Sequence, residues 1–411
     1  MSATGGVVAT GLGVAGPAGL GADALARALA DPLGADAPRP IVVDRSAGYH
    51  RPGGSRTALS ATGLDLGGLL PPAAARRMSP PARLACAAAR LALAEAGLDD
   101  PVLHLHTAIV VGTAFGPSSV TEALLRQILH AGPDQASPAL FTESVASASA
   151  SQAALLWKMR GPSLAVTQRE ASDLLALAEA VGQIETGRAE RALVLVVDEM
   201  TPLLHAVLDR FHALARPDAA GEERARPFDR RRDGALAAEG AVALLLEPRR
   251  VAEARGARMR FAVAGHGAGF DPSAPNRDWG EGEEILARRL VRLLERTGGA
   301  SGVDRIVSGA AGTRRGDRLE ARTLRLAWGG RPLPPVLAPK ATLGEYGGGF
   351  LAAAALLAGG APAGATPGFA EPDPALGLAP HDGRPLPPPQ RTLVTSLATS
   401  GAAAWALLDP A

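Results

Sequence analysis

The sequence predicts an α/β protein built from two similar halves, because its pattern of expected elements occurs twice. Three segments of the first half have counterparts in the second: 7–16 in 261–269, a helix and strand at 82–116 in 283–312, and a strand, turn and helix at 164–187 in 336–360. Repeated β-α-β units place helices on both faces of their sheets. We therefore expect a layered α-β-α-β-α body, with residues 1–252 as one half and 253–411 as the other.

The first half opens with an apolar strand at Val7–Thr10, followed by the glycine-rich run Gly11–Gly16 and a helix that begins near Asp23. The run matches the dinucleotide pattern GxGxxG. However, no acidic residue ends a second strand about 20 residues later, as ribose binding would require. We therefore favour a plain turn from strand to helix over a cofactor site. Residues 31–80 are rich in Pro, Gly and Arg and predict an irregular surface excursion.

The next elements follow at regular intervals. We expect a helix at 82–96, a strand at 107–112, a helix closed by Gly132, a buried strand at 192–197, and a charged loop followed by a long strand at 226–248. A run of small residues near 144–151 either packs at an interface or forms a surface loop.

The stretch GPSLAVTQREASDLLALAEA, residues 161–180, predicts a buried strand at Leu164–Thr167 that turns sharply into a helix. We call the turn at Gln168–Glu170 the first elbow. A helix N-terminus favours a nucleophile or an anion. Glu170 occupies that position.

Composition narrows the possible functions. Hydrophobic residues make up 47% of the 411-residue chain, and its formal net charge is +1, so neither nucleic acid nor a membrane surface is expected as a partner. The single cysteine, Cys86, lies in an amphipathic helix and is expected to be a buried core residue. No apolar run reaches the roughly 20 residues of a membrane span, and no signal peptide is apparent, so we expect a cytoplasmic protein. Neither a cofactor nor a metal is predicted.

Several motifs resemble those of the β-ketoacyl synthase family. RPFDRRRDGALAAEG at 226–240 is very similar to the family loop RPFDxxRDGFxxGEG, and GPSLAV at 161–166 resembles the strand that leads to the family's nucleophile. The resemblance covers nearly the whole chain and implies a thiolase-like five-layer fold. In that family a cysteine carries the acyl group and two histidines assist decarboxylation.

Matching these motifs residue by residue implies that three catalytic side chains have been replaced. The cysteine position holds Glu170, and the two histidine positions hold Gly309 and Glu345, whereas Lys340, Asp317 and Glu320 are retained. Acyl transfer requires a nucleophile and donors directed at a developing oxyanion. Glu170 is a poor acyl carrier because water would attack an anhydride. We therefore expect no intact catalytic set, and an isolated chain without condensing activity.

Glu170 could instead act as a catalytic base. We favour a structural role, either capped by a hydrogen-bond donor or paired with a lysine, because an unpaired buried charge is costly. For the same reason Lys340 and Glu320 are expected to form a structural ion pair.

These replacements resemble those of a chain length factor, the noncatalytic partner of a type II polyketide ketosynthase. The resemblance implies a heterodimer with a cysteine-bearing synthase and a tunnel lined by Ser118, Thr121 and Leu125, which lie on one face of a helix. Two alternatives remain open. One is a divergent synthase-like enzyme, such as a decarboxylase or a hydrolase that uses Glu170. The other is a homodimeric acyl-binding scaffold.

Two further groups of residues are candidates for binding. Arg230 and Arg231, with Arg314 and Arg315, form positive clusters that could receive an acidic acyl carrier protein, although a solvated charged loop explains them almost as well. His104 and His106 alternate with leucines and would point to one face of a strand. No third metal ligand is evident, so core or surface histidines are expected.

Overall fold

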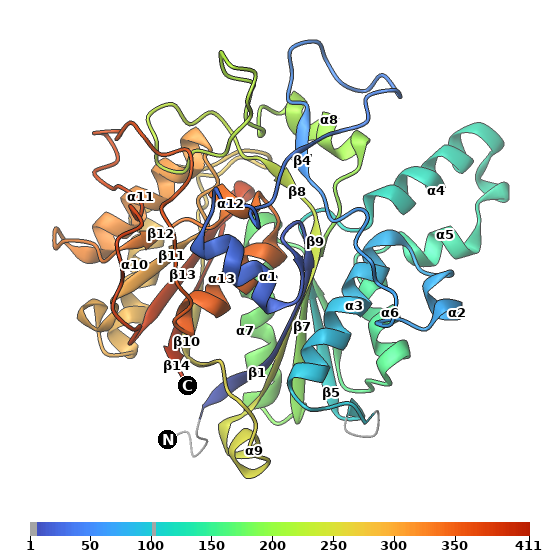
Figure 1. Ribbon diagram of the computed structural model, residues 1–411, viewed down its shortest axis with the longest axis horizontal. Helices are drawn as coiled ribbons and strands as arrows, with labels where there is room; N and C mark the ends of the chain where they lie inside the picture. Colours follow the sequence, from blue (N-terminus) through green and yellow to red (C-terminus); the bar gives the residue numbers. More distant parts are fainter. Residues whose placement is uncertain (1–5, 101–103) are drawn as a thin grey trace.

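A long twisted sheet runs through the centre of the protein, whose computed structural model describes residues 6–100 and 104–411 (Figure 1). Its strands, in spatial order, are β12 (Val336–Leu337), β11 (Arg305–Ser308), β13 (Thr392–Leu397), β14 (Ala402–Pro410), β10 (Phe261–Phe270), β1 (Val7–Gly16), β9 (Gly240–Pro248), β7 (Arg191–Asp198), β5 (Thr107–Gly112) and β6 (Ser163–Val166), with β2 (Gly19–Leu20) beside β1. β1 and β10 pair only from Val7–Val263 to Ala9–Phe261 and then separate. The sheet therefore opens into two parts.

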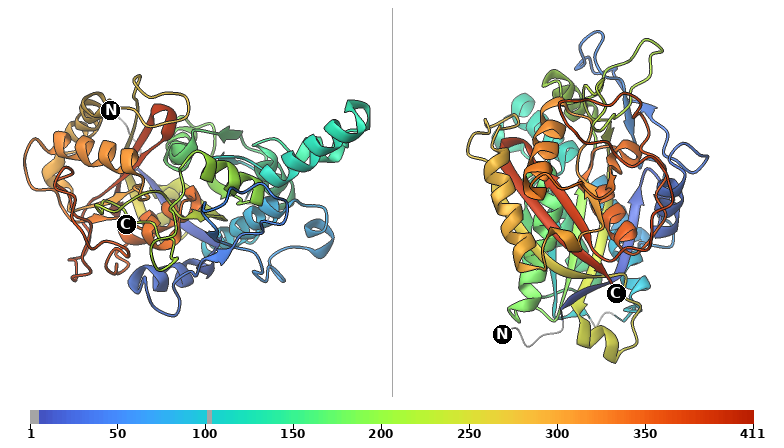
Figure 2. Two further views of the ribbon diagram at one scale, coloured as in Figure 1. Left: turned by 90° about the horizontal axis from the view of Figure 1, so that it is seen from above. Right: turned by 90° about the vertical axis from the view of Figure 1, so that its left-hand side faces the viewer.

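Helices fill the space between the two parts and cover both outer faces. α7 (Ser172–Glu185) and α13 (Gly347–Ala358) lie between them and form the central core. α3 (Pro80–Glu95) and α6 (Ala148–Trp157) cover one outer face, and α10 (Glu283–Arg296) and α11 (Arg314–Trp328) cover the other (Figure 2). The expected α-β-α-β-α arrangement is confirmed.

The remaining elements lie around this body. They are α1 (Ala22–Ala30), α2 (Pro72–Ala75), α4 (Ser118–Ala131), α5 (Pro138–Glu143), α8 (Pro202–Arg210), α9 (Arg249–Ala254), α12 (Lys340–Leu343), and a small sheet of β3 (Ile41–Val42), β4 (Thr57–Leu59) and β8 (Ala237–Ala238). The expected surface excursion at 31–80 is largely irregular, as predicted. The run of small residues became part of α6, whose inner residues Ala150 and Ala153 are buried against α3.

The glycine-rich run after Thr10 is not a turn, as we had expected, but a continuation of strand β1 to Gly16. α3 packs directly on this strand, and a Cβ atom on Gly11 or Gly13 would collide with the carbonyl oxygens of Ala92 and Ala88. The glycines are therefore explained by close helix packing, and the resemblance to a dinucleotide motif is incidental.

Strand β6 also differs from the expectation of a fully buried strand. It is the last strand of the sheet, and its side chains alternate, with Ser163 and Ala165 exposed and Leu164 and Val166 partly buried. A strand that pairs on one side only leaves a row of backbone donors and acceptors open to another chain.

Across the described parts of the chain, we find no helix with both the length and the apolar character needed to span a bilayer.

Candidate functional site

The first elbow holds Glu170 between the end of β6 and the start of α7. A short 3₁₀ turn, Arg169–Ala171, precedes the helix, and the Ser172 hydroxyl donates to the Thr113 carbonyl at the end of β5 (3.0 Å). The Glu170 carboxylate accepts hydrogen bonds from the backbone N–H of Thr399 (3.0 Å) and from its hydroxyl (3.1 Å). Of the two structural roles considered for Glu170, the structure therefore contains the one in which a donor caps the carboxylate.

The second elbow, residues Lys340–Tyr346, places Glu345 beside a buried lysine. The Lys340 ammonium bonds a Glu345 carboxylate oxygen at 2.7 Å and lies 5.1 Å from the centre of the Phe350 ring. Burial raises the pKa of Glu345 to about 7, and Glu170 adds to this, whereas Lys340 opposes it. Burial lowers the pKa of Lys340, but Glu345 and Asp173 outweigh that effect, so its pKa is raised overall. The lysine is therefore held charged by its two carboxyl neighbours.

The expected ion pair between Lys340 and Glu320 is absent, because Lys340 bonds Glu345 instead. The Glu320 carboxylate accepts a hydrogen bond from the hydroxyl of Ser308 (2.8 Å). Burial raises the pKa of Glu320 to about 8. We had assigned the wrong partner because the sequence does not reveal that the turn at Gly344 brings Glu345 back onto the lysine.

Gly309 and Asp317 lie where β11 leads toward α11. The Gly309 N–H donates to the Thr395 carbonyl, and a Cβ atom on Gly309 would lie 2.9 Å from that same oxygen. Asp317 is fully buried and accepts a hydrogen bond from the N–H of Phe228 at 2.8 Å, which ties the loop at 226–234 to α11. Burial raises the pKa of Asp317 to about 6. Asp317 thus holds this loop in place.

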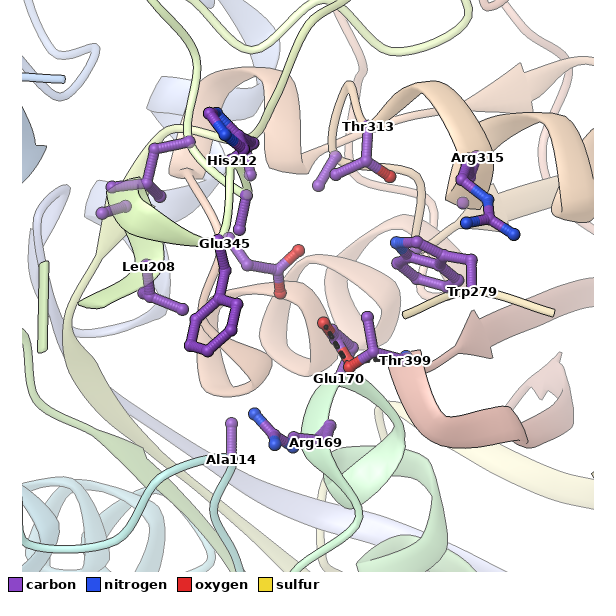
Figure 3. Close-up of a pocket in the computed structure, with 18 of the residues that line it drawn as sticks. Ala114, Arg169, Glu170, Leu208, His212, Trp279, Thr313, Arg315, Glu345 and Thr399 are labelled. Atoms are coloured by element: carbon purple, nitrogen blue, oxygen red, sulfur yellow. Dashed lines mark hydrogen bonds between the residues drawn. The ribbon is translucent and has the colours of Figure 1, made fainter. Parts of the chain in front are cut away.

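All three replaced positions line one cavity of about 970 Å³. Figure 3 shows the Glu170 and Glu345 carboxylates directed into the same space, with Thr313, Trp279 and Arg315 on the far side. Gly309 contributes backbone to the same wall. The two elbows therefore meet in the middle of the molecule, although they are 175 residues apart in the numbering, from Glu170 to Glu345.

One wall of the cavity is apolar and comes from α8 and the residues after it. Leu204, Val207, Leu208, Phe211 and Leu214 line this side. Val207 and Phe211 remain exposed, at 38% and 55% of their surface. Apolar side chains that face an open cavity are typical of a ligand pocket.

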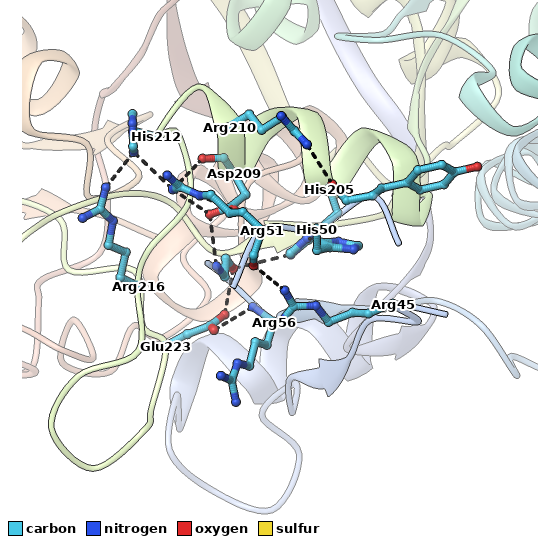
Figure 4. A network of polar contacts seen from close by, with 12 residues as sticks. Arg45, His50, Arg51, Arg56, His205, Asp209, Arg210, His212, Arg216 and Glu223 are labelled. Carbon is cyan, nitrogen blue, oxygen red and sulfur yellow. Dashed lines mark hydrogen bonds and ion pairs between the residues drawn. The ribbon is translucent and has the colours of Figure 1, made fainter. Parts of the chain in front are cut away.

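A strap of irregular chain, residues 44–56, holds α8 in place (Figure 4). The Arg51 guanidinium forms an ion pair with Asp209 at 2.8 Å, and His50 Nε2 lies 3.1 Å from His205 Nδ1. Burial lowers the pKa of both histidines, which favours the neutral rings that such a contact needs. The strap therefore fixes the position of the apolar wall.

The expected tunnel residues lie on α4, away from the cavity lining. The Ser118 hydroxyl lies 3.3 Å from that of Thr201, and the Thr121 hydroxyl donates to the Pro117 carbonyl. Leu125 is 51% exposed. The three residues share one helix, and their tunnel role stays a prediction.

The four arginines predicted for carrier binding lie on two adjoining segments. Arg314 and Arg315 begin α11 and line the cavity mouth, while Arg230 and Arg231 lie on the neighbouring loop. Arg314 donates to the Arg232 carbonyl, which joins the two segments. Arg315 pairs with Asp278 and Arg231 with Asp229, so part of this charge is neutralised within the chain.

His104 and His106 do not lie on a strand, as the alternation had suggested, but in the turn before β5. His104 is buried between the carbonyls of Leu98 and Trp157, and His106 is exposed. Cys86 is buried in α3, and burial raises the pKa of its thiol to about 12. Within the described ranges, no cluster of His, Cys, Asp or Glu side chains could hold a metal ion.

Sequence reasoning missed three features of the site. Thr399, which caps Glu170, lies 229 residues further along the chain. The apolar wall of α8 has an ordinary amphipathic pattern. Arg169 precedes Glu170 and lines the cavity. Its position beside Glu170 in the first elbow was the one feature of the sequence that could have indicated this role.

The family described as "Beta-ketoacyl synthase, N-terminal domain" matches residues 5–252. A Streptomyces coelicolor protein with the provisional name actinorhodin polyketide β-ketoacyl synthase 2 is 32% identical over 281 residues, or 66% of each chain. Nodulation protein E of a Rhizobium species (strain N33) is 31% identical over 250 residues, or 60% of each chain. The matches span between 56% and 60% of the length of the first curated relatives.

A solved structure described as the ishigamide ketosynthase/chain length factor superimposes on the whole chain with a TM-score of 0.86 and 28% identity, and the match covers 100% of both chains. The predicted thiolase-like five-layer fold is therefore confirmed over the full length of the chain.

Proposed function

Because the chain belongs to the β-ketoacyl synthase family, we propose that it is a noncatalytic, ketosynthase-like subunit of the chain length factor type. In this proposal it pairs with a cysteine-bearing ketosynthase and helps to shape the tunnel for the growing chain in type II polyketide or fatty-acid-like biosynthesis. We also propose that its halves are residues 1–252 and 253–411, since each supplies one part of the central sheet.

One observation carries the proposal. The side chain at the nucleophile position, Glu170, accepts hydrogen bonds from the Thr399 N–H and hydroxyl. A carboxylate therefore engages these two donors, which leaves neither of them free to stabilise a developing oxyanion. Gly309 has no side chain to offer, and Glu345 is engaged by Lys340. The cavity is therefore present, but none of these three positions offers a side chain that is free to catalyse carbon–carbon bond formation.

A synthase partner is supported by the free edge of β6 and the helices next to it. Exposed apolar side chains project from α4, α5 and α6, among them Leu129 (80% exposed), Phe141 (62%) and Leu155 (77%). α6 packs beside β6, and α5 contacts both α6 and α4, so the exposed apolar side chains follow a series of contacting helices that begins next to the open strand edge. An apolar patch next to an unpaired strand is typical of a protein–protein interface.

An acyl carrier protein is the second proposed partner. Arg230 and Arg314 form no ion pair among the described residues and lie on the adjoining segments at the cavity mouth. Acidic side chains of a carrier would find positive charge there.

Co-expression with a cysteine-bearing ketosynthase of the same organism, followed by size measurement and a carrier-dependent chain extension assay, tests the proposal. We expect a stable heterodimer, and extension only when both subunits are present. Leu129→Asp combined with Leu155→Asp should abolish association, whereas Leu326→Asp, at an exposed site on α11, should not.

Two results would overturn this function. A homodimer that ignores the synthase would favour the scaffold alternative. Turnover by the isolated chain that disappears in Glu170→Ala would favour the divergent enzyme.

A further inference from the structure

Arg169 projects a positive charge into the cavity without a negative partner. Its guanidinium lies 5.7 Å from the centre of the Phe115 ring. Among the residues described, it forms neither an ion pair nor a hydrogen bond. Figure 3 shows Arg169 extending toward Ala114, while the neighbouring Glu170 carboxylate turns the other way toward Thr399. The adjacent acid therefore does not neutralise it.

The backbone of Arg169 is held in an unfavourable conformation. Its φ angle is +51°, in the left-handed region that a long side chain rarely adopts. Such strained conformations are concentrated at functional sites. Here the conformation belongs to the turn that directs Arg169 and Glu170 to different parts of the cavity.

The rest of the cavity supplies an apolar surface for a ligand. The α8 wall carries Val207 and Phe211, which are exposed to the cavity. A volume of about 970 Å³ is ample for a medium-length aliphatic chain. Arg216, Arg277, Arg314 and Arg315 also line the cavity, and Arg169 is the one that adjoins Glu170 at the first elbow. A cation together with an apolar wall suits an amphiphile that has one anionic end.

We propose that this cavity binds a straight-chain carboxylic acid, with its carboxylate on the Arg169 guanidinium and its chain along the apolar wall of α8. The inference concerns the cavity alone and requires no synthase partner. An arginine presents paired N–H donors that match the two oxygens of a carboxylate. Seven acidic residues line the cavity against five arginines, and this excess of carboxyl groups would repel a doubly charged phosphate more strongly than a singly charged carboxylate.

Calorimetric titration of the full chain with decanoate, 1-decanol and decyl phosphate at neutral pH tests this assignment. We expect decanoate to bind about tenfold more tightly than decanol, because only the acid gains the charge-assisted hydrogen bonds. Decyl phosphate should bind more weakly than decanoate.

Variants locate the carboxylate. Arg169→Gln should bring decanoate to within about twofold of decanol while leaving decanol binding unchanged, which also shows that the variant is folded. Arg288→Gln, at an exposed position on α10, is the matched control and should retain the full preference. Phe211→Ala should weaken acid and alcohol equally.

The assignment is wrong if the wild type does not distinguish decanoate from decanol or binds neither. It is also wrong if the preference survives in Arg169→Gln, or if decyl phosphate binds most tightly. If Arg169→Gln does not fold, Arg277→Gln, at another arginine that lines the cavity, provides a second test. Loss of the preference for decanoate in Arg277→Gln would place the carboxylate on Arg277 and contradict the assignment. An unchanged preference in Arg277→Gln would support the assignment.

Discussion

The two elbows place the same residue type in the same cavity and hold it by different means. Glu170 is held by neutral donors, the N–H and hydroxyl of Thr399. Glu345 is held by the fully buried ammonium of Lys340. The chemical identity of a side chain therefore says little about its role until its partners are known. Each elbow also depends on its partner to a different degree, and this difference can be measured.

Removing the cation of the second elbow should have the largest effect. Lys340→Met would leave Glu345 and Asp173 without their buried counter-charge, and breaking such a pair costs about 3–5 kcal/mol of folding free energy. Urea unfolding measures this loss. The double variant Lys340→Met with Glu345→Gln should recover part of it. A loss below about 1 kcal/mol in the single variant would mean that the pair contributes little.

The pH dependence of stability should report on Glu345 at the second elbow. The pKa of Glu345 is raised in the folded state from 4.5 to about 7, so its contribution to stability is fully present below pH 4.5 and is lost as the pH rises toward 7. Glu345→Gln should remove this loss, which is on the order of 3 kcal/mol.

The wild type is the reference for that experiment, and Glu345→Gln should have a smaller slope of stability against pH between 4.5 and 7. Chemical unfolding at a series of pH values gives both slopes. Equal slopes in the wild type and in Glu345→Gln would contradict a raised pKa of Glu345.

The smallest effect is expected at the first elbow. Glu170→Ala removes the acceptor for the Thr399 N–H and should cost about 1.5–3 kcal/mol, as for a hydrogen bond to a charged group. Thr399→Val removes only the hydroxyl donor and should cost about 1 kcal/mol. Thermal unfolding resolves the two. A Thr399→Val loss as large as that of Glu170→Ala would mean that the hydroxyl, and not the backbone, holds the carboxylate.

The layered fold could be predicted from the sequence, because similar segments recur in the two halves of the chain. Glu170 and Glu345 each follow a strand of a duplicated unit, and in the structure both line the same cavity. The prediction failed where the hydrogen-bond or ion-pair partner of a side chain is distant in the sequence, or where a local turn determines which partner the side chain reaches. Nothing in the order of residues indicates that Thr399 caps Glu170 or that Lys340 turns to Glu345. Likewise, Gly11 and Gly13 suggested a turn. Their small size is needed by helix α3, whose contacting residues Ala92 and Ala88 lie 81 and 75 residues further along the chain.

The outer edge of β6 also affects the tendency of this protein to aggregate. Its unpaired N–H and C=O groups will accept any extended chain that reaches them, including β6 of a second molecule or a partly folded neighbour. An edge left unpaired in this way is at risk of aggregation, and the proposed synthase partner would remove that risk by covering it. We expect the yield of soluble protein to rise when that partner is co-expressed.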